Sequence, residues 1–204
     1  MYRPAEEVGG DFFQVIAVEV GGALIALGDV SGKGLKAAMT VSLIVGSLRT
    51  LADFTQNPAG ILQGLNRRLM GRTDGGFVTC LIALIEANGA TTMANAGHLA
   101  PFRDKEELPV SGSLPLGLAP DAAYDELVFV LHEGETLTFY TDGILEARNS
   151  TGELYGFERL AALVRSDPTV EQMVGKHAVS GSRTTLRFSG LPGWRSPHPR
   201  TKPS

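Results

Sequence analysis

The segment Gly28-Asp29-Val30-Ser31-Gly32-Lys33-Gly34 decides how the rest of this chain is interpreted. It follows an apolar run at residues 23–27 and precedes a pattern of helical spacing at residues 35–54. The carboxylate of Asp29 is therefore expected at the end of a strand. The glycines around it let the backbone turn sharply and leave room beside it. A strand end of this kind is suited to holding a hard cation or a phosphate group.

A β-hairpin is expected to bring a second carboxylate to Asp29. Residues 12–20 are rich in β-branched and aromatic side chains and predict a strand. Gly21-Gly22 is a turn signal, and residues 23–29 predict the returning strand. Because the outer ends of paired strands lie side by side, the sequence predicts that Asp11 and Asp29 lie close together.

The remaining pattern predicts further hairpins with helices between them, which is typical of an α+β layered fold. Strands are expected at residues 77–85, 90–95, 101–102, 127–131 and 136–140. Helices are expected at residues 35–54, 58–72, 157–164 and 169–177. A polar loop is expected after residue 102.

Composition excludes several classes of protein. The 204 residues suit one domain, or one domain with a tail, and the formal charge of −4 argues against a nucleic-acid-binding protein. No continuous run of about 18 apolar residues predicts a membrane span, and no secretory signal opens the chain. The single cysteine, Cys80, is interpreted as a core residue of a strand. A chain with one cysteine fits a reducing, cytoplasmic location.

Three carboxylates, those of Asp11, Asp29 and Asp142, are expected at strand ends. Clustered carboxylates repel one another, and a divalent cation such as Mg²⁺ or Mn²⁺ relieves the repulsion. Two such ions can clamp a phosphate and lower the pKa of a water molecule, which suits phosphoester hydrolysis. Taken singly, each aspartate is more often a turn or capping residue. Only their convergence favours a metal site.

Other candidate residues have two interpretations each. The segment from Gly28 to Lys33 is one residue shorter than a phosphate-binding loop requires, and Gly34 stands where a hydroxyl is needed. Lys33 is then either a solvated lysine or a phosphate contact. His98 is either an acid–base group or, by preference, a loop histidine that ties down backbone carbonyls. Glu146 could orient a water molecule or simply lie on a helix face.

Several blocks of sequence, in order, resemble one protein family. They are Pro4–Phe13, Gly28–Gly34, Phe77–Thr79, Asn95–His98, Leu114–Gly117, Tyr140–Ala147 and Gly152–Gly156. Together they are similar to the metal-dependent protein phosphatases, in the bacterial branch typified by the sporulation phosphatase SpoIIE and by stress-response regulators of sigma factors. The resemblance covers residues 2–179.

The resemblance implies an αββα four-layer sandwich of two mostly antiparallel sheets flanked by helices, with two Mn²⁺ or Mg²⁺ ions between the sheets. By motif match, Asp29 bridges both ions and is the catalytic residue. Asp11 and the carbonyl of Val30 hold one ion, and Asp142 holds the other. The family hydrolyses phosphoserine or phosphothreonine with metal-activated water.

In this branch the usual substrate is a small phosphorylated anti-anti-sigma protein. A homodimer is a candidate assembly of this chain. No nucleic acid or membrane is expected as a partner. The helices at residues 35–54 and 58–72 correspond to the family's switch element. Residues 1–179 are thus interpreted as the phosphatase domain, whose N-terminal edge lacks a first strand.

The tail at residues 180–204 departs from the family. A final strand with the sequence Asp-Asp-Ile-Thr-Val is expected there, and its aspartate is a ligand of the second ion. This chain has Thr184-Thr185-Leu186-Arg187-Phe188 instead, before a Pro- and Arg-rich end that predicts disorder. Codons for Asp-Asp-Ile-Thr-Val-Phe, read one base late, can give Thr-Thr-Leu-Arg-Phe, so we hypothesise a reading-frame change between about residues 175 and 183. The alternative function is a catalytically impaired pseudophosphatase that acts as a binding module in a sigma-factor partner-switching pathway.

Overall fold

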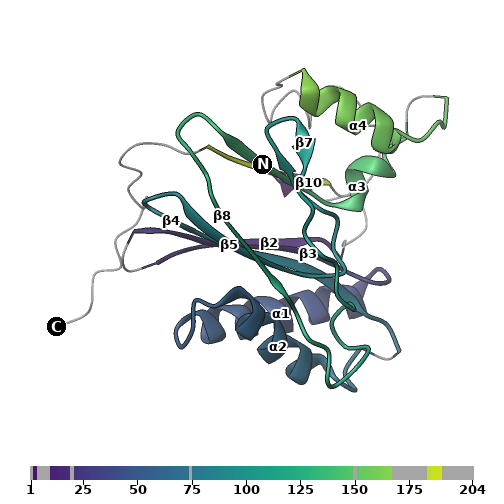
Figure 1. Ribbon diagram of the computed structural model, residues 1–204. Helices are drawn as coiled ribbons and strands as arrows, with labels where there is room; N and C mark the ends of the chain where they lie inside the picture. The colour runs from purple at the N-terminus through teal and green to yellow at the C-terminus, as the bar shows by residue number, and fades with distance from the viewer. Residues whose placement is uncertain are drawn as a thin grey trace.

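Two β-sheets face each other at the centre of the structure, and helices cover both outer faces (Figure 1). The computed structural model describes residues 2–3, 10–18, 21–73, 75–148, 151–166 and 183–189. The two facing sheets and their covering helices confirm the predicted α+β sandwich of four layers. The helix predicted at residues 169–177 lies outside the described residues.

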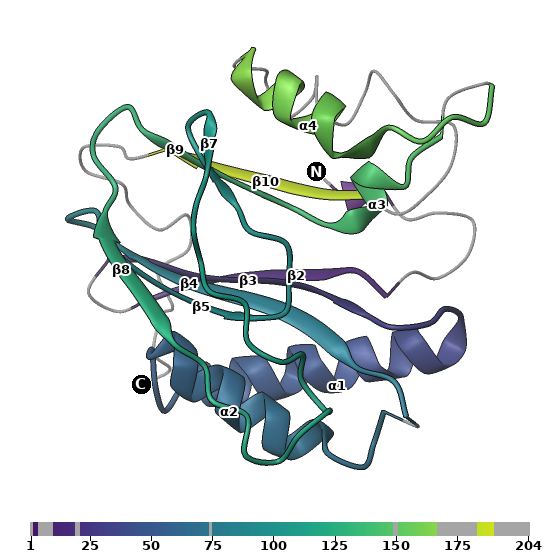
Figure 2. The same cartoon turned by 45° about the vertical axis from the view of Figure 1, so that its right-hand side comes forward.

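The first sheet has the strand order β2-β3-β4-β5-β8, and every neighbouring pair is antiparallel. Its strands are β2 (Phe12–Ala17), β3 (Gly22–Val30), β4 (Val78–Glu86), β5 (Ala90–Ala96) and β8 (Glu126–Val130). Helices α1 (Leu35–Ala52) and α2 (Pro58–Leu69) cover its outer face (Figure 2). Asn57 caps α2 through its side-chain oxygen, and Pro58 occupies the first turn, as the sequence predicts.

The second sheet has the order β1-β10-β9-β6-β7. Its strands are β1 (Tyr2–Arg3), β6 (Phe102–Arg103), β7 (Glu106–Glu107), β9 (Thr136–Tyr140) and β10 (Arg183–Ser189). Helices α3 (Asp142–Leu145) and α4 (Gly156–Arg165) lie between β9 and β10 in sequence, and α4 lies above the outer face of this sheet (Figure 2).

Three separate apolar clusters fill the three spaces between the four layers. Side chains alternate between the two faces of a strand, so one strand can serve two clusters. In β3, Leu24 and Ala26 pack with α1 and α2, whereas Ile25 and Leu27 pack between the sheets. The third cluster joins the second sheet to α3 and α4 and contains Tyr140. This alternation explains why β3 is apolar at nearly every position.

The structure corrects two predictions in the second sheet. The expected disorder beyond residue 180 is wrong for Arg183–Ser189, which form β10 between β1 and β9, because Thr, Leu and Phe favour a strand. Residues 190–204 lie outside the described part of the chain. The expected polar loop after Phe102 is in fact the β6–β7 hairpin, turning through Asp104 at a φ of 51°. The start of the chain also supplies a strand, β1, which pairs with β10.

Helix α1 has a mean hydropathy of 1.3 over 18 residues. By length and composition alone it reaches the level of a membrane span, and it is the one helix among the described residues that does so. In this fold it packs through Ile44 and Leu48 into the cluster shared with α2 and the first sheet. A single apolar helix of this kind is weak support for a membrane location.

Gly28 is predicted to be a position where any side chain destabilises the first sheet. A Cβ atom there would lie 2.2 Å from the backbone oxygen of Thr79 and 2.5 Å from the ring of Phe12. Because backbone cannot move aside cheaply, Gly28→Ala should lower the free energy of unfolding by about 2–3 kcal/mol. That loss corresponds to roughly 5–10 °C in the midpoint of thermal unfolding.

Gly46→Ala in α1 is the matched control, because a Cβ atom there meets nothing within 4 Å. It should leave stability unchanged or raise it slightly, since alanine favours a helix. Equal melting temperatures for the two variants would contradict the close approach of β3 and β4.

Candidate metal centre

Polar side chains replace the apolar core at one end of the space between the sheets. The pattern of alternation that turns Ile25 and Leu27 inward also turns Asp29 inward, at the end of β3. On β2, Phe12 belongs to the helix side, so Asp11 before it faces the second sheet. The register places Phe12 opposite Gly28, and hence Asp11 beside Asp29, as predicted.

Gly10 allows the chain before β2 to approach Asp29 and Val30 closely. Its carbonyl accepts a hydrogen bond from the N–H of Val30 at 3.2 Å. A Cβ atom at position 10 would lie 2.3 Å from the carbonyl oxygen of Val30 and 2.7 Å from a carboxylate oxygen of Asp29. Two oxygen donors therefore face the same small space, which only a glycine leaves open.

Asp29 is the carboxylate whose ionised form is disfavoured by its surroundings in this site. Burial, followed by repulsion from Asp11 and then from Asp142, raises the pKa of Asp29 from 3.8 to about 7. A side-chain hydrogen bond with Asp11 acts in the same direction, and the backbone N–H of Val30 opposes it. The three predicted carboxylates are thus close enough to interact, although Asp142 lies 113 positions after Asp29 in the sequence.

Asp142 comes from the second sheet. Strand β9 ends at Tyr140, and Asp142 is exposed at the first position of α3. The prediction of a strand-end carboxylate is therefore correct in place, with a short helix following directly. Between them Thr141 is fully buried, and its hydroxyl donates a hydrogen bond of 2.8 Å to Oδ2 of Asp11.

His98 joins the two sheets behind the carboxylates. Its Nδ1 lies 2.9 Å from the hydroxyl of Thr79 on β4, and its Nε2 lies 3.2 Å from the carbonyl oxygen of Tyr140 on β9. Burial lowers the pKa of His98 to about 4, against a smaller opposite effect of the Tyr140 carbonyl. The imidazole is neutral at physiological pH, and both nitrogens are engaged. The interpretation of His98 as a histidine that ties down a backbone carbonyl is confirmed.

The donor set is chemically suited to Mg²⁺ or Mn²⁺, which prefer carboxylate and carbonyl oxygens and keep several waters. Among the described residues, no three His, Cys, Asp or Glu side chains converge on a single point. The predicted site does not require three such side chains around one ion. It gives each ion at most two carboxylates, and Asp29 is shared by both ions. Burial and the neighbouring carboxylates disfavour the ionised form of Asp29, and a bound cation would favour it.

Three further candidates have simpler roles. Cys80 is completely buried in the cluster under α1 and α2, and burial raises the pKa of its thiol, so the prediction of a core residue is confirmed. Lys33 is exposed just before α1, and a phosphate contact there stays a prediction. Glu146 is exposed at the end of α3, where its N–H bonds to the carbonyl of Asp142.

Sequence reasoning missed the hydroxyls of Thr79 and Thr141 and the amide of Asn95. Each interrupts an alternating apolar pattern at a position that faces between the sheets, next to Leu81, Phe139 and Met93 respectively. These three residues could have been identified from the sequence, because each is a polar residue at an inward-facing position near the end of a strand. The partners of these side chains, by contrast, are separated from them by between 3 and 130 residues along the chain.

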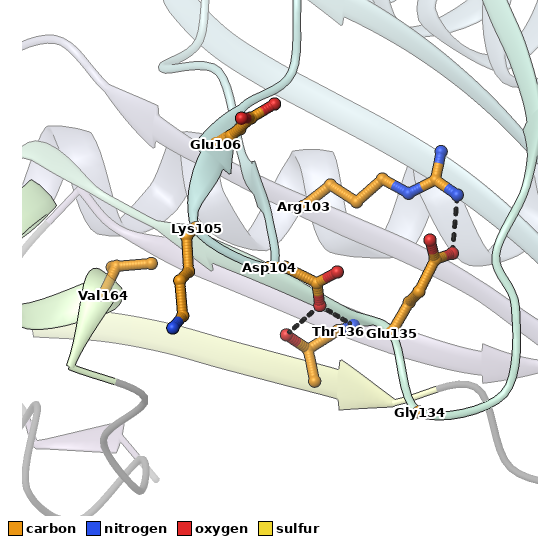
Figure 3. A pocket seen from close by; sticks show the side chains of 8 residues that line it. All are labelled: Arg103, Asp104, Lys105, Glu106, Gly134, Glu135, Thr136 and Val164. Carbon is orange, nitrogen blue, oxygen red and sulfur yellow. Dashed lines mark hydrogen bonds and ion pairs between the residues drawn. The ribbon is translucent and has the colours of Figure 1, made fainter.

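A pocket of about 730 Å³ lies at the opposite end of β9, away from the carboxylates (Figure 3). Figure 3 shows Arg103 turned toward Glu135, with which it forms an ion pair, and Asp104 turned toward Thr136, which donates to it. Thr136 is the first residue of β9 and Tyr140 the last, so the pocket and the carboxylates occupy different ends of the strand. The pocket therefore contributes nothing to the candidate metal centre.

The chain is similar to several known proteins. The chain is 27% identical over 192 residues to phosphoserine phosphatase RsbU of Bacillus subtilis, a match that covers 90% of this chain and 53% of that protein. The chain thus spans about half the length of this curated relative.

Two solved structures share the fold. The SiaA-PP2C domain of Pseudomonas aeruginosa superposes with a TM-score of 0.74 at 22% identity, covering 93% of this chain and 84% of the other. The RsbU and RsbW domains of Rv1364c from Mycobacterium tuberculosis superpose with a TM-score of 0.73 at 23% identity, covering 92% and 58%. The family model described as Stage II sporulation protein E (SpoIIE) matches residues 19–179. The chain therefore belongs to the SpoIIE family, as its motifs predict.

Proposed function

We propose that this chain is a metal-dependent protein phosphatase that removes phosphate from serine or threonine of a small regulatory protein of anti-anti-sigma type. The observation that supports this best is that Asp11 and Asp142, from separate elements, lie near enough to Asp29 to help raise its pKa. The similar protein from Bacillus subtilis is named a phosphoserine phosphatase, and one similar structure contains RsbU and RsbW domains. These names favour a role in partner switching that controls a sigma factor.

Four residues would hold the metal ions. Asp29 would contribute to both, Asp11 and the carbonyl of Val30 to one, and Asp142 to the other. When bound, two divalent cations supply positive charge for the phosphoryl oxygens and lower the pKa of a water so that it can attack phosphorus. The chain's own task is to present ionised oxygens at one place, against their mutual repulsion.

Hydrogen bonds in the structure serve that task. The Thr141 hydroxyl donates to Oδ2 of Asp11, which helps to hold that carboxylate in place beside Asp29. His98 does not protonate the leaving oxygen, because its imidazole is neutral and both ring nitrogens already have partners.

One observation favours the second candidate function, an impaired phosphatase that binds its partner without efficient turnover. Strand β10 has the sequence Arg-Thr-Thr-Leu-Arg-Phe-Ser, which contains no carboxylate. Since Thr185 lies opposite Tyr140, the residues that precede it in β10 come opposite the Thr141–Asp142 segment. The strand that reaches the candidate metal centre from this side thus adds no negative charge. The second ion would be held with more water and less protein.

The reading-frame hypothesis offers an origin for this strand. It requires that codons 184–188, read in the neighbouring frame, encode an Asp-Asp-containing strand. The nucleotide sequence around codon 180 decides the question, and a neighbouring frame without those aspartates would end the hypothesis.

Asp29→Asn should abolish phosphate release. The substitution keeps the size of the side chain but removes the charge shared by both ions, so the rate with Mn²⁺ should fall by at least about 100-fold. The measurement is phosphate release from a phosphoserine peptide and from p-nitrophenyl phosphate. Asp121→Asn, at an exposed loop position, is the matched control and should keep the wild-type rate. Equal rates for Asp29→Asn and wild type would overturn the proposal.

The metal-free protein should become less stable as pH rises from about 4 to about 7. In the folded chain Asp29 keeps its proton up to a pKa of about 7, whereas the unfolded chain releases it near 3.8. The folded state therefore binds more protons in this window, and its stability is lost as pH increases. Thermal unfolding in EDTA should show this slope for wild type.

Asp29→Asn separates that effect from other titrations. The variant should lose this part of the pH dependence in EDTA and melt above wild type at pH 8. Added Mn²⁺ should raise the melting temperature of wild type at pH 8, because a bound ligand stabilises the folded state, and should leave Asp29→Asn nearly unchanged. Parallel pH curves for the two proteins in EDTA would show that the ionised form of Asp29 is not disfavoured.

A double substitution, Thr184→Asp with Thr185→Asp, should strengthen the second metal site. Added carboxylates at the end of β10, where Thr185 lies opposite Tyr140 and Thr184 precedes it, would supply the missing negative charge, and Mn²⁺ affinity at the weaker site should rise by about tenfold or more. Isothermal titration with Mn²⁺ measures it. Thr184→Asn with Thr185→Asn has the same shape without the charge and should leave the affinity unchanged. An equal gain in both pairs would contradict the assignment.

A further inference from the structure

His98 lies between the two sheets, where the distance is too large for backbone hydrogen bonds to connect them. Stacked sheets lie about 10 Å apart, so only side chains connect one to the other. The imidazole reaches from Thr79 on β4 of the first sheet to the carbonyl of Tyr140 on β9 of the second. It is buried, so neither contact can be replaced by bulk water without opening the structure.

The partners of the ring fix its tautomer. A backbone carbonyl can only accept, so Nε2 must carry the hydrogen that it donates to Tyr140. Nδ1 is then a lone-pair acceptor, and the hydroxyl of Thr79 donates to it. The direction of both hydrogen bonds therefore follows from the carbonyl of Tyr140, which can only accept.

The turn that carries His98 is built to aim the ring. The side chain of Asn95 accepts from the N–H of His98 at 2.8 Å and donates to its carbonyl at 2.9 Å. Between them Gly97 has a φ of 69°, and a Cβ atom there would lie 2.7 Å from the Pro115 ring. The histidine is thus held at its backbone on both sides, which leaves its ring little freedom.

The carbonyl of Tyr140 needs such a donor because strand pairing stops short of it. β6 pairs with Leu137 and Thr138 of β9 and begins only at Phe102. Continued in the same register, the ladder would place Ala100 opposite Tyr140, but β6 does not extend that far. On that side of β9, the ring N–H of His98 takes the place of the missing strand.

We propose that His98 is a positioning residue for the metal centre, setting where the Thr141–Asp142 segment of the second sheet stands against Asp11 and Asp29 of the first. Two consecutive residues carry the connection: Tyr140 through its carbonyl to His98, and Thr141 through its hydroxyl to Asp11. Asp142 follows directly and is exposed, so its own burial does not fix it. This role rests on the proposed function, because it assumes a metal centre. The hydrogen bonds of His98 can be tested independently of that function.

The test compares His98→Ala, His98→Gln and Thr79→Val with wild type. Loss of the ring should weaken Mn²⁺ binding to the folded protein by about 10-fold to 100-fold, the range found when groups that orient metal ligands are removed. The turnover number should fall with little change in KM. His98→Gln can still donate to a carbonyl and accept from a hydroxyl, so it should retain more affinity than His98→Ala. Thr79→Val removes only the donor to Nδ1 and should give an intermediate loss.

His132→Ala is the matched control, because His132 is exposed on the loop between β8 and β9. It should match wild type in Mn²⁺ affinity and rate. If His98→Ala lowers only the melting temperature, with Mn²⁺ affinity and turnover unchanged at a temperature where it is folded, His98 is merely structural and the proposal is wrong.

Nitrogen NMR of protein labelled at histidine gives a readout that needs no variant to fold. His98 should appear as the neutral tautomer with hydrogen on Nε2, and a ring with hydrogen on Nδ1 would overturn the proposal. The outcomes also separate it from the proposed function. Absence of phosphate release from wild type would count against the phosphatase, while Mn²⁺ affinity and the tautomer would still decide the role of His98.

Discussion

The repulsion between the carboxylates of Asp11, Asp29 and Asp142 is the constraint on which the rest of the structure depends. Two sheets bring them to one end of a space that is otherwise apolar, where charge is poorly screened. Such an arrangement is unfavourable for folding, and a chain selected for stability alone would place apolar side chains there. The site is therefore the part of the fold where stability and function oppose each other.

Cross-sheet hydrogen bonds keep the repelling groups in place. The segment Tyr140–Thr141 is joined to the first sheet at two consecutive residues, through a carbonyl and a hydroxyl. Each partner is buried, so breaking one bond exposes a polar group to an apolar space at a cost of about 1–3 kcal/mol. That cost opposes the tendency of the sheets to separate where their charges meet. The two sheets are thus held together by hydrogen bonds at the end with the carboxylates and by apolar packing at the other end.

The sequence predicts the parts of this fold that local pattern controls. The hairpin of β2 and β3, the helices α1 and α2, and the meeting of Asp11 with Asp29 follow from period, turns and caps. The approach of Asp142 and the bridge made by His98 depend on how one sheet stacks on the other, which no local pattern specifies. The resemblance gave Asp142 its role beside Asp29, and neither pattern nor resemblance predicted the bridge between the sheets or the hydrogen bonds of Thr79 and Thr141.

The error at β10 shows why fold and site can separate. A strand between two others needs backbone donors and acceptors and residues that favour extended structure, and Thr, Leu and Phe satisfy this whatever their origin. The prediction of disorder weighed the Pro- and Arg-rich segment that follows and overlooked these seven residues. A metal ligand, by contrast, requires one kind of atom at one position. A chain can therefore complete its sheet with a strand that brings no carboxylate, and keep the fold while the second ion is held less firmly.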